Sequence, residues 1–87
     1  MPRLRKLLVA REAVTDFRLI TEPLRSEVVA RLKLLTRFPN IGRFVPSEIP
    51  HVRATTVGIF RIFYRVTARG VEVIFIRHCK RRVPNLD

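Results

Sequence analysis

The 87-residue chain has few of the residues on which many cofactor sites and small secreted folds depend. It contains one cysteine, Cys79, so a scaffold stabilised by internal disulfides is excluded. Cys79 joins His51 and His78 as the only soft metal ligands, fewer than the four that a structural zinc ion normally takes. Three isolated glycines cannot build a glycine-rich phosphate loop. The sequence therefore predicts neither a metal nor a cofactor, and the single cysteine favours the cytoplasm.

Acidic residues and long apolar runs are also scarce. Lys and Arg number 18 against seven Asp and Glu, which gives a formal charge of +11. The longest apolar runs are far shorter than the roughly 20 residues of a membrane-spanning helix, so we expect no membrane segment. The hydrophobic fraction is nevertheless 47%, which is enough to form a core and excludes a disordered chain. At this length we expect a single domain over residues 1–87.

The first half of the chain has helical spacing in two segments. Residues 11–21 place apolar side chains at i, i+4 and i+7, on one face, at Ala13, Phe17 and Ile20. A second helix is expected to have Thr21 as its N-cap and to end before Pro39. Its apolar face consists of Leu24, Val28, Leu32 and Leu35. The two segments predict a helical hairpin with two apolar faces to be covered.

The second half of the chain has the features of strands. Residues 3–10 predict a weak first strand, whereas three prolines and a glycine predict a loop over 38–50. Further strands, with a hairpin loop at 68–70, are expected over 52–57, 59–67 and 71–77. The order β-α-α-β-β-β predicts an α+β fold. In it the helical hairpin packs on an antiparallel sheet of three to four strands, the last three of which form a meander.

The segment 59–67 separates two kinds of side chain. Its apolar face includes Tyr64, which we interpret as a core residue beside Phe60, Ile62 and Val66, and its other face presents Arg61, Phe63 and Arg65. Antiparallel pairing brings Arg77 near the start of this strand, and a basic tail follows with Lys80, Arg81 and Arg82. Such a positive surface suits a nucleic-acid backbone or an acidic protein. The alternative, a charged sheet edge that prevents aggregation, stays open.

His78 is the best candidate for acid–base chemistry, because histidine titrates near neutral pH without help. Beside several arginines, a neutral imidazole can act as general base in phosphodiester cleavage while arginine stabilises the anionic transition state. The alternative is a polar residue that closes a strand. The carboxylates are too scattered to form an acid–base pair, and Cys79 has no residue placed to complete a triad.

Four features of the second half together resemble one superfamily. They are the turn Pro39-Asn40-Ile41-Gly42-Arg43, the pair Val52-Arg53 followed by Gly58, the strand "FRIFYRV", and the hairpin into "VEVI" that His78 closes. Through them the sequence resembles, over residues 11–82, the RelE/ParE superfamily of bacterial toxins. The resemblance implies a toxin of a two-gene module, neutralised by a cognate antitoxin with an acidic, extended C-terminal segment. Such a partner gives the charge of +11 a function beyond nucleic-acid binding.

The resemblance implies two mechanisms. The ParE-like branch poisons DNA gyrase, and the RelE-like branch cleaves mRNA in the ribosome without a metal. The "NIGR" turn and the strand ending "IRH" are more similar to the ParE-like branch, and the C-terminal tyrosine of several ribonuclease members is absent. We therefore expect a gyrase-directed toxin that needs no catalytic group. Its target-binding residues would be Arg61, Arg65, Arg77, Lys80, Arg81 and Arg82.

Two alternatives accompany this expectation. In a RelE-like ribonuclease, Arg61 matches the strand arginine of the family motif and His78 acts as base. The other alternative is an inactive or purely binding basic domain. The first strand departs most from the family pattern, because it is unusually basic and Lys6 interrupts its alternation.

Overall fold

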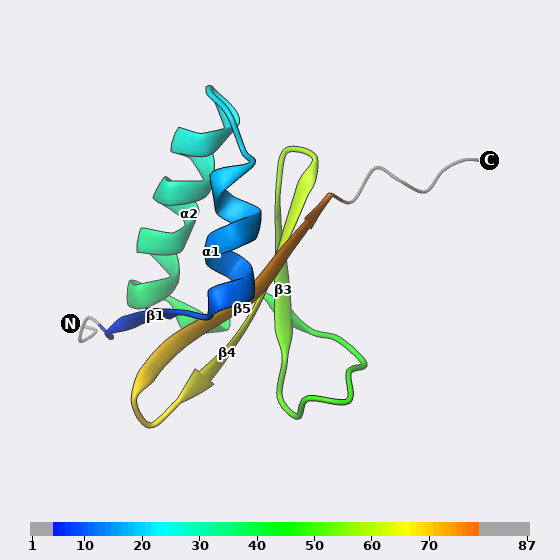
Figure 1. Ribbon diagram of the computed structural model, residues 1–87. Helices are drawn as coiled ribbons and strands as arrows, with labels where there is room; N and C mark the ends of the chain where they lie inside the picture. Colours follow the sequence, from blue (N-terminus) through cyan, green and yellow to red (C-terminus); the bar gives the residue numbers. More distant parts are fainter. Residues whose placement is uncertain (1–4, 79–87) are drawn as a thin grey trace.

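The computed structural model describes residues 5–78, which form two α-helices on one face of a five-stranded sheet (Figure 1). In chain order the elements are β1 (Leu7–Val9), α1 (Arg11–Arg18), α2 (Leu24–Arg37), the 3-10 turn η1 (Pro39–Ile41), β2 (Arg43–Phe44), β3 (Arg53–Val57), β4 (Phe60–Thr67) and β5 (Gly70–His78). This arrangement confirms the predicted α+β fold. Within the described range, neither helix has the length and apolar character required to cross a membrane.

The sheet has the strand order β1-β5-β4-β3-β2. Strands β3, β4 and β5 are antiparallel neighbours, so the predicted meander is confirmed. Two expectations were wrong. The sheet has five strands rather than three or four, because the segment predicted as a loop contributes β2, which pairs with β3. It is also not wholly antiparallel, because β1 runs parallel to β5 with Leu7 opposite Val71. The weak first strand predicted over residues 3–10 is present as β1, which spans three residues, whereas β2, which spans two, had no local signal.

The helix boundaries differ from the predicted ones at the tip of the hairpin. Helix α1 ends at Arg18, and Pro23 rather than Thr21 occupies the N-cap position of α2. The Glu22 carboxylate provides the acceptor there, because both the backbone N–H and the hydroxyl of Ser26 donate to its Oε1, at 3.2 and 2.7 Å. An acidic group at this place also complements the positive end of the helix dipole.

The core lies between the helices and the facing side of the sheet. Both predicted helix faces and the apolar face of β4 contribute to it, and the prediction of Tyr64 as a core residue is confirmed. The fully buried side chains include Ala13, Val28, Leu35, Ile62, Tyr64, Val71 and Val73. Each large aliphatic side chain contributes about 1.5–3 kcal/mol when removed from water, which keeps the helices on the sheet.

A β-bulge in β5 decides which side chains of this strand face the helices. Phe63 is opposite Phe75, whereas the next residue, Tyr64, is opposite Val73, which makes Ile74 the extra residue. Because side chains alternate along a strand, one extra residue reverses the alternation on its far side. The core residues of β5 are therefore Val71, Val73 and Ile76. The side chains that turn away from the helices beyond the bulge are those of Phe75 and Arg77.

Candidate functional site

The side of β4 and β5 that faces away from the helices brings the predicted strand arginines together. We call it the β4–β5 face and define it by Arg61, Phe63, Arg65, Glu72, Phe75 and Arg77. Its centre is an aromatic pair, since the Phe63 and Phe75 rings lie 4.8 Å apart between centroids. The guanidinium of Arg61 lies 5.2 Å from the Phe63 ring, and that of Arg77 lies 4.3 Å from the Phe75 ring. Both contacts are within the range of a cation–π interaction.

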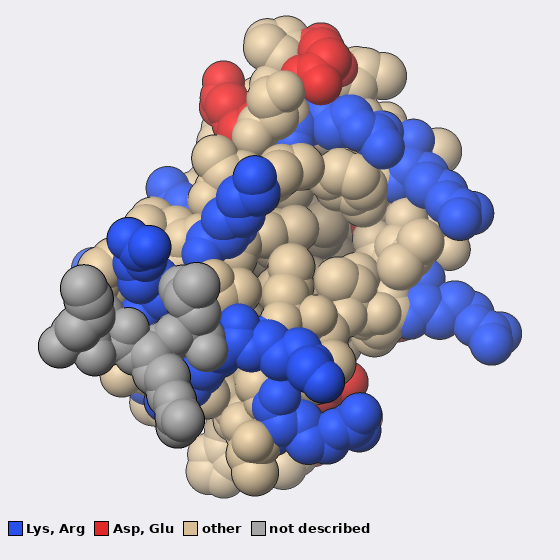
Figure 2. All heavy atoms as spheres, turned by 90° about the vertical axis from the view of Figure 1, so that its left-hand side faces the viewer, with Lys and Arg blue, Asp and Glu red and all other residues tan. Residues whose placement is uncertain are grey.

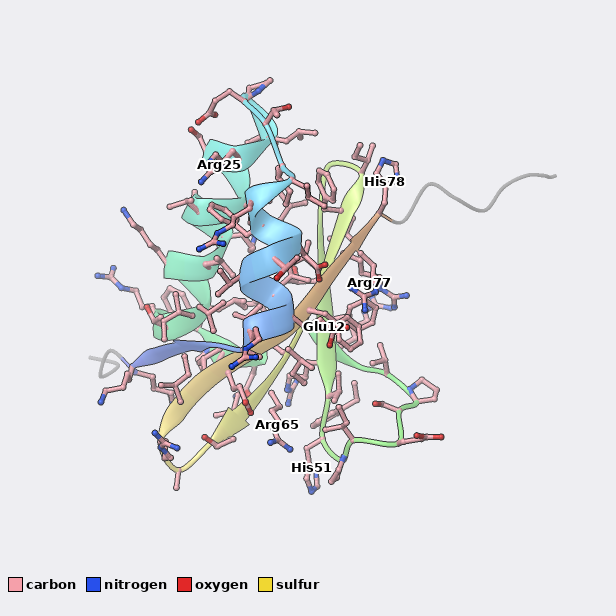
Figure 3. All side chains as sticks on the ribbon, viewed as in Figure 1. Glu12, Arg25, His51, Arg65, Arg77 and His78 are labelled. Atoms are coloured by element: carbon pink, nitrogen blue, oxygen red, sulfur yellow. The ribbon has the colours of Figure 1, made fainter. Side chains whose placement is uncertain are left out.

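Two of the three arginines on this face are bonded to carboxylates. Arg65 donates from Nε to Glu72 Oε1 at 2.8 Å. Arg77 donates from Nη1 to Asp16 Oδ2 at 2.8 Å and from Nη2 to Glu12 Oε2 at 3.2 Å. Figure 3 shows Arg77 and Glu12 approaching each other from β5 and α1. This contact was not predicted from the sequence, although Glu12 and Asp16, four residues apart, share a helix face.

Asp16 has a second bond that explains its position. Its Oδ2 also accepts the backbone N–H of Ile76 at 2.9 Å. Strand β1 pairs with β5 only as far as Val73, so the edge of β5 beyond that residue needs another acceptor. Asp16 and Arg77 together join α1 to this edge. Their arrangement therefore supports the fold.

Arg61 differs from its two neighbours on the face. Within residues 5–78, no carboxylate lies within ion-pair distance of its guanidinium, and the side chain is exposed. It stands directly opposite Arg77, an unfavourable pairing of like charges that the two carboxylates around Arg77 offset. A planar guanidinium in this state can bind a phosphate or carboxylate with two parallel hydrogen bonds. Lys80, Arg81 and Arg82, the other predicted contacts, lie outside the described residues.

The structure does not bring His78 to Arg61. His78 is opposite Phe60, and their rings meet edge to face with centroids 5.3 Å apart. Phe60 packs against the core, so His78 lies on the helix side of the sheet and Arg61 on the other. His51 lies at the other end of the molecule (Figure 3). Among the described residues, His, Cys, Asp and Glu form no group of three that could hold a metal ion.

Tyr64 explains the turn after α2. Its hydroxyl donates to the carbonyl of Pro39 at 2.6 Å and accepts the N–H of Gly42 at 2.9 Å. A Cβ at Gly42 would lie 2.5 Å from this hydroxyl, so the turn requires glycine. Burial raises the pKa of Tyr64 above its ordinary value of 10.0, so the hydroxyl stays protonated and able to donate to a higher pH than a free tyrosine. The "NIGR" turn, from which part of the family resemblance came, therefore has a structural reason.

Known proteins support the toxin resemblance at two levels. The sequence matches the family described as the ParE toxin of the type II toxin–antitoxin system parDE, over residues 7–83. The fold is similar to that in the RelBE2 toxin–antitoxin complex from Mycobacterium tuberculosis, with a TM-score of 0.75 and 16% identity, covering 92% of this chain and 100% of that one. No curated protein gives a significant match.

Two further solved structures share the fold. The chromosomal ParDE toxin–antitoxin system from P. aeruginosa matches with a TM-score of 0.69 and 23% identity, covering 88% of this chain and 98% of that chain. The isolated E. coli RelE toxin matches with a TM-score of 0.74 and 18% identity, covering 92% and 88%. The family match spans nearly the whole described fold, from β1 through β5. The chain therefore belongs to the ParE toxin family of type II toxin–antitoxin systems.

Proposed function

We propose that the chain arrests bacterial growth by binding DNA gyrase, and that it does so without a catalytic group of its own. The observation that supports this proposal is the separation of Arg61 from His78 by the sheet. General acid–base catalysis requires the base within hydrogen-bond reach of the reacting group, beside the groups that stabilise it. A toxin that acts by binding has no such requirement.

The β4–β5 face has the composition of a protein-binding surface. Arginine and large aromatic side chains are enriched among the residues that contribute most to binding. Here the guanidinium of Arg61, which has no carboxylate partner within residues 5–78, lies beside the half-buried rings of Phe63 and Phe75. The aromatic pair would provide apolar contact area and Arg61 a charged hydrogen bond to the target. Residues 80–82 would add positive charge that steers the encounter.

The partner that neutralises the toxin is an antitoxin with an acidic segment, in the same cytoplasm. Two solved neighbours, RelBE2 and ParDE, are named as toxin–antitoxin systems. This chain has the charge of +11 that an acidic segment would offset. It also has an apolar hollow of about 210 Å³ between the helices and β5, lined by Val9, Ala13, Val14, Phe17, Leu32, Val73 and Ile76. A hollow of this size accepts one apolar side chain of a partner.

A second candidate function is ribosome-dependent cleavage of mRNA. One observation favours it, since an aromatic pair beside a free arginine also suits an unstacked RNA base and its phosphate. In this alternative, His78 would have to act from the other side of the sheet or after a rearrangement of the end of β5. The two functions therefore differ in their dependence on His78.

The test compares the wild type, two site variants and one control variant in two assays with the purified chain, inhibition of DNA supercoiling by gyrase and ribosome-dependent cleavage of mRNA. The gyrase proposal expects inhibition of DNA supercoiling by the wild type and by His78→Ala, and loss of inhibition in Arg61→Glu. Leu19→Glu is the matched charge control, because Leu19 is 80% exposed at the tip of the helical hairpin. Ribosome-dependent mRNA cleavage that His78→Ala abolishes, with gyrase unaffected by the wild type, would establish the ribonuclease instead.

A further inference from the structure

The strand register extends the β4–β5 face as far as the edge strand β2. Arg43 on β2 is opposite Ala54 on β3, and Ala54 is in turn opposite Phe63. Phe63 is opposite Phe75, so the four residues form one row across four strands. Residues directly opposite each other project on the same side of a sheet. Arg43 therefore lies on the same side as the β4–β5 face, although 18 residues separate it from Arg61 in the sequence.

Arg43 and Arg61 lie on either side of an apolar surface. Both are exposed, and within residues 5–78 neither has a carboxylate within ion-pair distance. They belong to β2 and β4, two strand spacings apart, which separates them by about 10 Å across the sheet. Between them are the short side chain of Ala54 and the half-buried ring of Phe63. A ligand that lies across β3 can therefore contact apolar surface at its centre and a guanidinium at each end.

The turn that carries Arg43 is held on both sides of the preceding residue, Gly42. The N–H of Gly42 donates to the hydroxyl of Tyr64, and the carbonyl of Gly42 accepts Nη1 of Arg53 at 2.7 Å. Both backbone groups of Gly42 are therefore bonded, which fixes the backbone from which the Arg43 side chain extends. A side chain that is oriented before binding loses less conformational entropy when a ligand is bound. Tyr64, buried on the helix side, is thus placed to act on Arg43 without touching the ligand.

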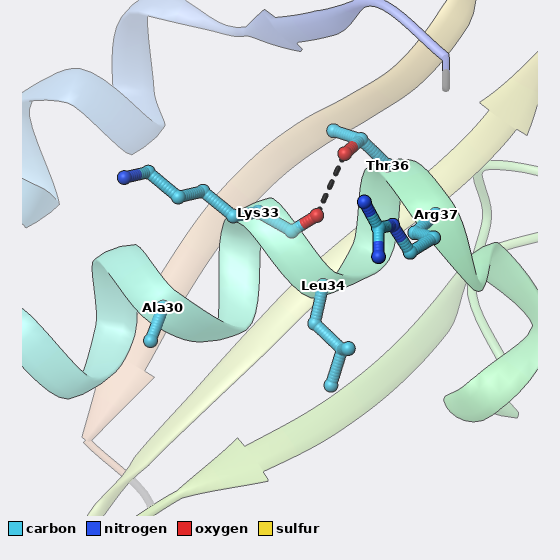
Figure 4. A pocket seen from close by; sticks show the side chains of 5 residues that line it. All are labelled: Ala30, Lys33, Leu34, Thr36 and Arg37. Atoms are coloured by element: carbon cyan, nitrogen blue, oxygen red, sulfur yellow. Dashed lines mark hydrogen bonds between the residues drawn. The ribbon is translucent and has the colours of Figure 1, made fainter. Parts of the chain in front are cut away.

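Cations on the exposed side of α2 provide a comparison for Arg43. Lys33 and Arg37 line a hollow of about 420 Å³ there (Figure 4). Like Arg43, they are exposed and have no carboxylate within ion-pair distance among residues 5–78. Helix α2 covers the other side of the sheet, so these cations cannot share a ligand segment with Arg61. Figure 2 shows Lys and Arg spread over a whole face of the molecule, so charge alone does not identify the target-binding residues.

We propose that Arg43 is a second target-binding residue, which receives an acidic segment of gyrase together with Arg61, and that Tyr64 positions it. This inference rests on the proposed gyrase function and adds the chemistry of the segment that is recognised. The segment would carry two carboxylates on either side of an apolar side chain. Each carboxylate would accept paired hydrogen bonds from one guanidinium, while the apolar side chain packs over Ala54 and Phe63.

The test measures binding of the purified chain to gyrase holoenzyme by calorimetry. Arg43→Glu should raise Kd about tenfold, because it places a carboxylate against an acidic segment, and Arg43→Ala should raise Kd about fivefold. Arg37→Glu is the matched control, since it makes the same change of charge on the other side of the sheet, and its Kd should stay within about twofold of wild type. Tyr64→Phe should raise Kd about threefold in the wild-type background and leave Kd unchanged in a chain that already carries Arg43→Ala.

The outcomes separate this inference from the proposed function. Unchanged gyrase binding by both Arg43 variants, together with loss of binding in Arg61→Glu, would overturn the role of Arg43 alone. Equal weakening by Tyr64→Phe with and without Arg43 would overturn the positioning role of Tyr64. If Arg43→Glu weakens binding only to the small protein encoded beside this chain's gene, Arg43 belongs to the antitoxin surface and the inference is wrong. A wild-type chain that does not bind gyrase would overturn the proposed function, and this inference with it.

Discussion

The β4–β5 face and the exposed side of α2 around Lys33 and Arg37 are both positively charged, yet the cations of the two regions differ in their partners. On the β4–β5 face, Arg65 and Arg77 are bonded to carboxylates of the same chain. On α2, Lys33 and Arg37 have no such partner within residues 5–78. A count of cations therefore does not locate a binding surface, because some cations are already bonded to carboxylates of the same chain. Among the β4–β5 arginines, Arg61 is the one without a carboxylate partner within residues 5–78.

The largest expected effect is a loss of gyrase binding when Arg61 on the β4–β5 face is replaced. Arg61→Glu should weaken binding to gyrase by about 100-fold, because it replaces a charged hydrogen-bond donor at the centre of the interface by a repulsive group. The free energy of unfolding should change by less than about 0.5 kcal/mol, since the exposed side chain has no ion pair to lose within residues 5–78. Titration of the purified variant against gyrase measures the first quantity. Wild-type affinity would remove Arg61 from the target-binding surface.

The second effect concerns the link between the two regions. The turn that follows α2 is held by the Tyr64 hydroxyl, through Pro39 and Gly42. Tyr64→Phe should lower the free energy of unfolding by about 2 kcal/mol, because it leaves a buried carbonyl and a buried N–H without their partner. Urea denaturation measures the loss. An unchanged midpoint would mean that water replaces the hydroxyl at both groups.

A third, smaller effect tests the internal compensation of Arg77. Asp16→Ala should destabilise the fold by about 1.5 kcal/mol, since it removes the acceptor of both Ile76 N–H and Arg77. Arg77→Ala should cost less, about 0.5–1 kcal/mol, because Arg77 is 46% exposed and its ion pairs are screened by solvent. A double-mutant cycle by chemical denaturation isolates their coupling. Equal losses from the two single variants would contradict a distinct role for the bond to Ile76.

The smallest effect is a pH dependence. The folded-state pKa of Tyr64 lies above the ordinary value of 10.0, so the folded chain keeps a proton that the unfolded chain releases. The stability that this proton provides is therefore fully present below pH 10 and is lost as the pH rises through the folded-state pKa. Tyr64→Phe should flatten the fall in stability above pH 10, as followed by urea denaturation at successive pH values. If the free energy of unfolding falls equally steeply with pH in the wild type and in Tyr64→Phe, groups other than Tyr64 cause the loss of stability at alkaline pH.

Much of the fold could be predicted from local patterns. The helical spacing of Ala13 and Phe17 and the alternation around Tyr64 identified the core faces, because burial imposes the period of the element on the sequence. The same alternation placed Arg61 and Arg65 on one face. The boundaries at the hairpin tip were less predictable, since the Glu22 carboxylate rather than Thr21 meets the start of α2.

The candidate site was only partly predictable. The hairpin predicts that Arg77 lies near the start of β4, and the bulge at Ile74 then places it opposite Arg61 on the same face. The sequence could not show that Arg77 is ion-paired while Arg61 is exposed, because the carboxylates of Glu12 and Asp16 reach Arg77 from a helix far away in the sequence. The separation of His78 from Arg61 depends on the bulge at Ile74, which no local pattern specifies.

By itself, the sequence determined the class of fold, the core faces of the helices and of β4, the excess of positive charge and the toxin resemblance. These properties are local or summed over residues, so they need no knowledge of distant contacts. The tertiary structure alone decided which charges remain free and which side chains share a surface. The physical reason is that the bulge at Ile74 reverses the alternation of β5, while Asp16 and Glu12 neutralise Arg77 from α1. Through these non-local contacts, a diffuse charge of +11 becomes a β4–β5 face on which Arg61 stands beside an aromatic pair, and a separate group of cations along α2.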